Sequence, residues 1–75
     1  NVIGELLKAF TGAVFQPGGT RSRKLLQLIP AQFPISGSSL YHDLQSVVDF
    51  VAGMTDLYAM DMYRKLTGMN VAPLR

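Results

Sequence analysis

Residues 40–66, LYHDLQSVVDFVAGMTDLYAMDMYRKL, decide the predicted fold. Apolar side chains recur here at intervals of three and four residues, as on one face of an α-helix. These side chains are Leu40, Leu44, Val47, Val48, Val51, Tyr58, Met62 and Leu66. Ser38 or Ser39 is a suitable N-cap, and Gly68 is a typical C-terminal stop. The pattern therefore predicts one helix over 39–67.

This predicted helix is long for the size of the chain. At 1.5 Å per residue it would reach about 43 Å. A compact domain of 75 residues is only about 29 Å across. We therefore expect the helix to extend beyond the rest of the domain. Gly53 in its middle costs about 1 kcal/mol relative to alanine, which predicts that another backbone approaches closely there.

The N-terminal part of the chain predicts another helix, over 2–15. Its apolar residues also follow the helical spacing, and Pro17, Gly18 and Gly19 end the segment. Asn1 can cap this helix. Since no residue precedes Asn1, we expect the chain to begin inside a longer helix.

A short helix over 22–29 is predicted next, with Thr20 or Ser22 as its N-cap. Pro30 ends it, because the residue before a proline is pushed out of helical conformations. Residues 31–39 are predicted to form a connector. The sequence thus predicts an all-α subdomain with one long C-terminal helix, part of a larger helical protein.

The composition indicates that part of the apolar surface is covered by something outside these residues. The chain is 48% hydrophobic but only 16% charged, against about 25% charged residues in typical soluble proteins. The absence of cysteine excludes disulfide scaffolds and thiolate metal sites, and a single histidine cannot build a multi-histidine site. No apolar run approaches the roughly 18 residues of a membrane span, and no signal-peptide pattern is present. We expect a cytoplasmic protein without a membrane partner.

Positive charge is concentrated in one tract, Arg21, Arg23 and Lys24. Guanidinium groups near a helix N-terminus favour anions, so the tract could grip a phosphate, although a solvated basic turn is the commoner outcome. Nucleic-acid binders usually show a broader basic stripe or interleaved aromatic residues. The sequence has neither, so nucleic acid is not expected as a partner.

Two pairs of residues, His42 with Asp43 and Asp49 with Asp56, could take part in metal binding or acid-base chemistry. His42 and Asp43 are adjacent and could both ligate a metal, but the chain has no second histidine, and Asp43 suits the positive end of a helix dipole. Asp49 and Asp56 lie two helical turns apart, so a continuous helix would place both carboxylates on one face. Hydrogen bonding to a neighbouring element is the simpler interpretation of this pair. Neither group predicts catalysis.

Other residues of the C-terminal half have structural interpretations. Asp61 can form ion pairs with Arg64 or Lys65, three and four positions away. Tyr58 and Tyr63 are five apart, face different directions and form no stacking platform. The four methionines are expected to fill gaps in the core and in an interface; they are Met54, Met60, Met62 and Met69.

The stretch Asp49-Phe50-Val51-Ala52-Gly53-Met54-Thr55-Asp56-Leu57-Tyr58-Ala59 resembles the C-terminal segment of deoxyguanosinetriphosphate triphosphohydrolase-like proteins, which are HD-domain phosphohydrolases. The string Gly-Met-Thr-Asp-x-Tyr-Ala carries most of this resemblance. Residues 63–66, 22–26 and 29–33 also resemble that family. The similarity covers about residues 22–68.

The resemblance implies an all-helical parent enzyme. Such an enzyme hydrolyses a deoxynucleoside triphosphate to the deoxynucleoside and inorganic triphosphate, at a divalent metal held by His, His-Asp and Asp ligands. Those ligands belong to an upstream HD domain, and His42-Asp43 does not match them. The resemblance therefore implies that residues 1–75 form the phosphohydrolase-associated portion, with no catalytic residue and no cofactor of their own.

The resemblance also implies structural roles for the motif residues. Gly53 would allow close helix packing and Met54 would fill the interface. Thr55 and Asp56 would hydrogen-bond across it and hold Tyr58 in place. The expected partners are the HD domain of the same protein and further copies of the subunit.

Two residues are candidates for binding substrate. Arg23 and Lys24 would reach a phosphate of the deoxynucleoside triphosphate in the active site, in a regulatory site or in an adjoining subunit.

Two alternatives remain open from the sequence. The chain could be a stand-alone helical module for oligomerisation or protein interaction, in which case the apolar surplus would serve that contact. It could also be a small nucleic-acid binder that uses the basic tract.

Overall fold

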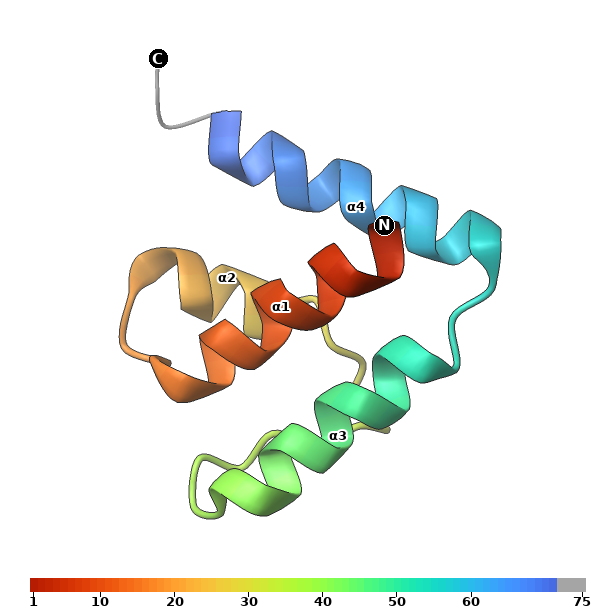
Figure 1. Ribbon diagram of the computed structural model, residues 1–75. Helices are drawn as coiled ribbons and strands as arrows, with labels where there is room; N and C mark the ends of the chain where they lie inside the picture. Colours follow the sequence, from red (N-terminus) through yellow and green to blue (C-terminus); the bar gives the residue numbers. More distant parts are fainter. Residues whose placement is uncertain (72–75) are drawn as a thin grey trace.

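Four α-helices make up the fold of the computed structural model, which describes residues 1–71 (Figure 1). They are α1 (Val2–Phe15), α2 (Thr20–Gln27), α3 (Leu40–Ala52) and α4 (Asp56–Val71). No strand occurs among the described residues. The predicted all-α class is therefore confirmed. None of the described helices is both long and apolar enough to cross a membrane.

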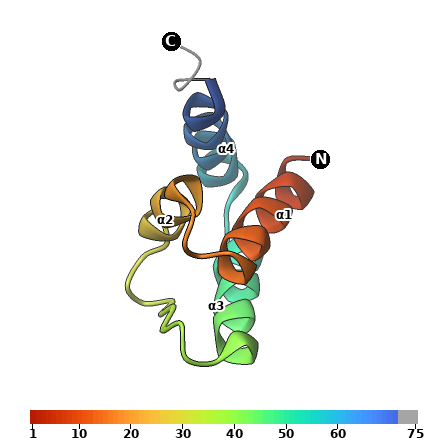
Figure 2. The same ribbon diagram turned by 90° about the vertical axis from the view of Figure 1, so that its left-hand side faces the viewer.

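Helix α1 is the central element, and α2, α3 and α4 all pack against it. Two perpendicular views place α4 and α3 at opposite ends of the fold with α1 and α2 between them (Figures 1 and 2). Phe10 and Leu6 of α1, Leu25 of α2 and Val47 of α3 are fully buried at the centre. Helix α4 adds Ala59, Met62 and Leu66 to the same core. A single core therefore joins all four helices.

The predicted long helix is wrong: α3 ends at Ala52 and α4 begins at Asp56. The N–H of Gly53 still donates to the carbonyl of Asp49 at 3.2 Å, but the N–H of Met54 turns to Val51 at 3.2 Å. Thr55 then starts α4, because its hydroxyl accepts a hydrogen bond from the N–H of Tyr58 at 3.2 Å. Such an N-cap satisfies a donor that would otherwise lack a helical partner.

The break changes the dimensions of the molecule. The described fold measures 35 × 28 × 20 Å, so the expected 43 Å helix does not exist. The predicted stop at Gly68 is also wrong, since α4 continues to Val71. The side chain of Met69 lies outside the described residues, and its predicted role stays untested.

Capping residues were predicted correctly at two helices and wrongly at one. The side chain of Asn1 accepts from the N–H of Gly4 at 3.1 Å, and Ser39 accepts from the N–H of His42 at 3.4 Å. Helix α2, however, is capped by the backbone of Gly19, without a side-chain hydrogen bond. Gly19 has an extended backbone and occupies the N-cap position, so Thr20 is the first residue inside α2 and cannot be its N-cap.

Candidate functional site

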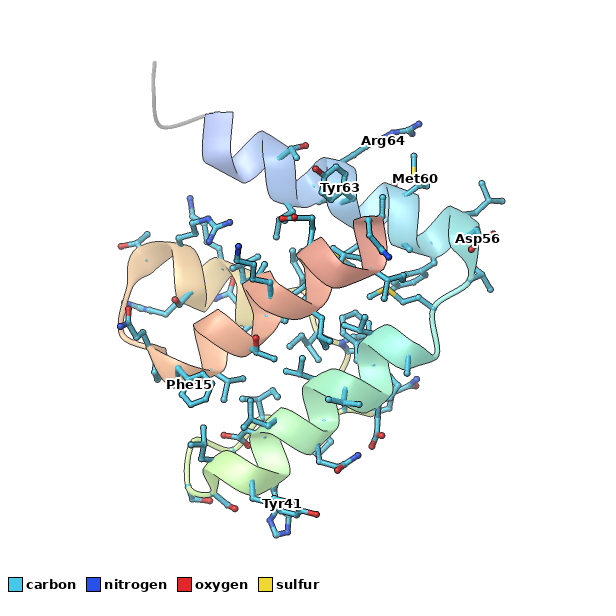
Figure 3. The ribbon with its side chains drawn as sticks, viewed as in Figure 1. Phe15, Tyr41, Asp56, Met60, Tyr63 and Arg64 are labelled. Atoms are coloured by element: carbon cyan, nitrogen blue, oxygen red, sulfur yellow. The ribbon has the colours of Figure 1, made fainter. Side chains whose placement is uncertain are left out.

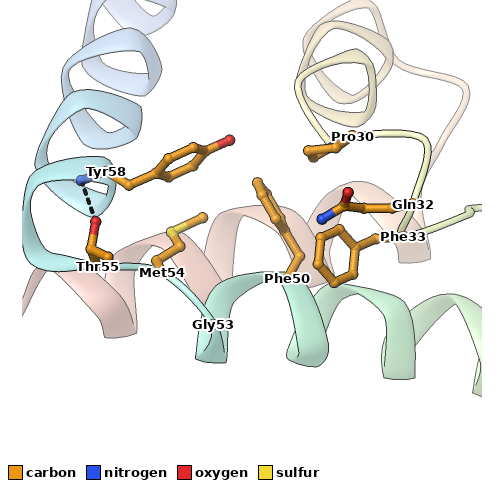
Figure 4. A pocket seen from close by; sticks show the side chains of 8 residues that line it. All are labelled: Pro30, Gln32, Phe33, Phe50, Gly53, Met54, Thr55 and Tyr58. Atoms are coloured by element: carbon orange, nitrogen blue, oxygen red, sulfur yellow. Dashed lines mark hydrogen bonds between the residues drawn. The ribbon is translucent and has the colours of Figure 1, made fainter.

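An aromatic pocket lies where two segments distant in the sequence meet (Figure 4). Its volume is about 270 Å³. One wall comes from the connector after α2 and contains Pro30, Gln32 and Phe33. The floor and the other wall come from the end of α3 and the start of α4, with Phe50, Gly53, Met54, Thr55 and Tyr58. We call this hollow the aromatic pocket.

Phe50 forms the floor and ties the aromatic pocket to the core. It is 4% exposed, and its ring meets that of Phe10 edge to face at a centroid distance of 5.7 Å. Phe33 lies 5.4 Å from Phe50 on one side, and Tyr58 lies 6.1 Å away at right angles on the other. Edge-to-face pairs of this kind add about 0.5–1.5 kcal/mol each beyond their buried area. The aromatic side chains are therefore held by one another.

The connector that carries Phe33 is fastened to α3 at two points. The Oδ1 atom of Asp43 accepts from the N–H of Ser36 and its Oδ2 atom accepts from the N–H of Gly37, each at 2.9 Å. The hydroxyl of Ser46 donates to the carbonyl of Pro34 at 2.7 Å. Gly37 has a φ of 78°, a conformation that favours glycine. These bonds fix the wall of the aromatic pocket.

The motif residues take partly different roles from those predicted. A Cβ on Gly53 would meet the carbonyl oxygens of Asp49 at 3.4 Å and Phe50 at 3.9 Å, both in its own turn. No neighbouring helix of the described residues approaches there, and the predicted close packing of Gly53 against helices of the parent enzyme stays a prediction. Thr55 does hold Tyr58, but through the N–H of its backbone within one chain.

Asp49 and Asp56 do not share the helix face that their spacing predicted for a continuous helix. They lie on different helices because the chain turns between Ala52 and Asp56. Asp49 accepts from the side-chain amide of Gln45 at 3.1 Å, within α3. Asp56 begins α4, where a carboxylate suits the positive helix end. Asp49 thus has a partner within its own helix, Asp56 lies at the start of the next helix, and the two carboxylates offer no shared acid-base site.

His42 and Asp43 point to different surroundings. His42 is exposed and its ring lies 5.8 Å from that of Tyr41. Asp43 is 4% exposed and turned into the connector. No group of three potential His, Cys, Asp or Glu ligands occurs among the described residues.

The basic tract lies on α2, away from the aromatic pocket. Arg21, Arg23 and Lys24 are all exposed. Arg21 borders a second hollow of about 410 Å³ between α1 and α2, together with Lys8 and Glu5. Arg23 and Lys24 line neither hollow.

The ion pair predicted in α4 is present: the ammonium group of Lys65 lies 3.6 Å from Asp61. Both side chains are more than half exposed, so the pair adds only a few tenths of a kcal/mol. Among the other methionines, Met62 is buried and Met54 lines the aromatic pocket, whereas Met60 is exposed.

The model of the phosphohydrolase-associated domain matches residues 2–65. The chain belongs to this family. Within the phosphohydrolase-associated domain of this chain, both segments that form the aromatic pocket fall inside the matched range. No solved structure matches the chain.

Curated relatives of this phosphohydrolase-associated domain carry one name, deoxyguanosinetriphosphate triphosphohydrolase-like protein. The relative from Pseudomonas aeruginosa PAO1 is 40% identical over 70 residues, covering 87% of this chain and 16% of its own length. Those from Synechocystis and Listeria monocytogenes are each 33% identical, covering 93% and 92% of this chain and 16% and 18% of their own lengths. The chain thus spans about a sixth of the length of these relatives.

Proposed function

We propose that this phosphohydrolase-associated domain is the structural and interface portion of a deoxynucleoside triphosphate triphosphohydrolase. The parent enzyme releases the deoxynucleoside and inorganic triphosphate, with a divalent metal bound by an upstream HD domain. The domain itself is not catalytic. The names of the relatives at up to 40% identity support this proposal. We further propose that the enzyme is cytoplasmic and oligomeric.

The observation that carries the interface role is the apolar surface left exposed by a complete core. Leu57 is 84% exposed, Tyr41 73% and Phe15 60%. Tyr58 and Met60 lie beside Leu57 at the start of α4 and are each 43% exposed. Leu57, Tyr58 and Met60 follow one another at the start of α4, and such a cluster of exposed apolar side chains typically marks an interaction surface. We call Leu57, Tyr58 and Met60 the apolar α4 patch.

Met60 of the apolar α4 patch points away from the core of the domain (Figure 3), whereas the ring of Tyr58 lies against Phe50. Met60 and Arg64, four residues apart, point to the same side of α4 and away from α1, whereas Tyr41 lies at the far end of the fold (Figure 3). The opposite face of α4 is the one that packs on α1, through Ala59, Met62 and Leu66. Helix α4 thus has a buried apolar face and a second apolar surface available to a partner.

The test compares the complete protein with a variant of the apolar α4 patch. Leu57→Asp should lower hydrolysis of dGTP by the complete protein at least tenfold, because a carboxylate is costly to bury in an interface. Gln27→Asp introduces the same charge at an exposed position of α2 and should change the rate less than twofold. Equal rates for both variants would contradict the interface role.

The phosphate role of the basic tract is part of the proposal. Arg23 and Lys24 are exposed and available to a triphosphate bound by the rest of the enzyme. Arg23→Ala in the complete protein should raise the KM for dGTP or weaken activation by nucleotide. If substrate affinity and nucleotide activation are both unchanged, this assignment fails.

A stand-alone oligomerisation module is the second candidate, since the same exposed side chains would serve it. Sedimentation of the 75-residue chain distinguishes the two functions. A stand-alone module should form a defined oligomer as concentration rises. The interface portion of a larger enzyme should show weak, non-saturating association when it is studied alone.

A further inference from the structure

The aromatic pocket is formed before anything binds to it. Its floor, Phe50, is locked against Phe10, and Phe33 is held by the two fastenings of the connector. Tyr58 is held at the capped start of α4. No described residue fills the space between these side chains. A preformed pocket binds its occupant without a large ordering cost.

The size of the aromatic pocket limits what can occupy it. A dry cavity of about 150 Å³ accommodates benzene, and sites for drug-sized ligands begin near 300 Å³. At about 270 Å³ the aromatic pocket has room for one large side chain, up to an indole ring. It is too small for a complete nucleotide.

The chemistry of the aromatic pocket also excludes a charged occupant. Its eight lining residues include no charged side chain. Three aromatic rings and Met54 form most of the surface, and the exposed Gln32 lies at the rim. An anion such as a triphosphate would lose its hydration there without gaining a counter-charge. An uncharged apolar or aromatic group fits this environment.

The neighbouring surface indicates that this group belongs to a protein. Tyr58 contributes both to the wall of the aromatic pocket and to the apolar α4 patch, so the two surfaces are continuous. A small molecule in the aromatic pocket would leave Leu57 and Met60 uncovered. A protein segment could place one anchoring side chain in the aromatic pocket and cover Leu57 and Met60 with its neighbouring residues. Buried aromatic anchors are typical of the centres of protein interfaces.

We propose that the aromatic pocket is the socket for one large apolar or aromatic side chain from the remainder of the same polypeptide. This inference rests on the proposed function in one respect, that a catalytic portion accompanies this domain. The relatives are long enough to include such a catalytic portion, since this chain covers only 16% of the length of the relative from Pseudomonas aeruginosa. The contact joins the domain to the catalytic portion through its connector and through the start of α4.

The experiment places a photo-cross-linking benzoylphenylalanine at position 32 of the complete protein, replacing Gln32. After irradiation and proteolysis, mass spectrometry should identify a peptide from outside residues 1–75, with the link at or beside a Phe, Tyr, Trp, Leu, Ile or Met. A control at Gln45, which is exposed on α3 and outside the aromatic pocket, should give at least tenfold less of this product. A link to residues 1–75 of a second copy, or a yield no higher than at Gln45, would overturn the proposal.

A second measurement does not depend on cross-linking chemistry. The chain contains no cysteine, so Gln32→Cys provides a single reporter at the rim within residues 1–75. In a background without other cysteines, maleimide should label it at least tenfold more slowly in the complete protein than in the 75-residue chain. Gln45→Cys should be labelled at similar rates in both. Equal labelling of Gln32→Cys in both forms would contradict the socket.

The socket and the proposed function fail separately. If free dGTP slows maleimide labelling of Gln32→Cys and the rest of the polypeptide does not, the socket is overturned and the aromatic pocket is a small-molecule site. Hydrolysis of dGTP by a protein whose rim stays open would leave the function standing without the socket. A protected rim in a protein that hydrolyses no deoxynucleoside triphosphate would leave the socket standing without the function.

Discussion

The N–H of Tyr58 donates to the hydroxyl of Thr55 at 3.2 Å, where a continuous helix would pair it with the carbonyl of Met54. This hydrogen bond begins α4 and separates it from α3. It also sets the position of the Tyr58 ring against Phe50, 6.1 Å away. One capping side chain therefore connects the course of the backbone with the shape of the aromatic pocket.

Thr55→Ala should lower the free energy of unfolding by about 1 kcal/mol, because it removes this N-cap. Urea denaturation followed by circular dichroism measures the change. Thr67→Ala in the same helix is the matched control, since its hydroxyl donates only to the carbonyl of Arg64 three residues earlier. That control should be neutral or slightly stabilising, given the helix propensity of alanine. Equal losses of unfolding free energy in the two variants would contradict the N-cap role of Thr55.

Asp43→Asn should destabilise the domain by about 1–3 kcal/mol, because an amide NH₂ would replace one of the two oxygens that accept N–H groups of the connector. Asp49→Asn is the control. Its carboxylate is exposed and accepts from Gln45 on the surface, so a change within about 0.5 kcal/mol is expected. An Asp43→Asn domain as stable as the control would show that the connector needs no such fastening.

Gly37→Ala should cost about 1 kcal/mol or more, since a φ of 78° strains any residue with a Cβ. Gly18→Ala tests the same substitution where a Cβ meets nothing within 4 Å and φ is not positive. Thermal unfolding of both variants should show a lower midpoint for Gly37→Ala alone. A parallel fall in both midpoints would contradict the conformational explanation.

Phe10→Ala should destabilise the domain by about 3–5 kcal/mol, which is comparable to the whole stability of a domain this small. Phe10 is fully buried and supports the floor of the aromatic pocket through Phe50. Phe15→Ala removes the same ring from a position that is 60% exposed, and it should keep the fold. One-dimensional NMR will distinguish an unfolded variant from a folded one.

Gly53→Ala should be neutral or stabilise the domain by up to about 1 kcal/mol, because Gly53 has a φ of −87° and alanine restricts the unfolded chain. A loss of more than about 1 kcal/mol in urea denaturation would contradict this conformational explanation.

The sequence predicted the helical class and the N-caps of α1 and α3 because these depend on local patterns. The break after α3 escaped prediction because Val51 and Tyr58 are seven residues apart, a spacing that one helix or two helices satisfy equally. The signal was present in Thr55 followed by Asp56, a typical start of a helix. This start signal was hidden because the helical spacing of apolar residues continues both before and after Thr55 and Asp56.

The aromatic pocket and the role of Asp43 could not be predicted from local patterns. Phe33 and Tyr58 are brought together only when the connector folds back over the end of α3. The Asp43 side chain had a sufficient explanation in the helix dipole, so its bonds to Ser36 and Gly37 were missed. Both features depend on tertiary structure that the residue spacing does not encode.

Hydroxyl-radical footprinting of the apolar α4 patch tests the central claim most directly. In the 75-residue chain, Leu57 and Met60 should be oxidised readily, in line with their exposures of 84% and 43%. In the complete protein their oxidation should fall at least fivefold, because the proposed catalytic portion would cover them. Equal oxidation of both residues in the two forms would contradict the account of this domain as an interface.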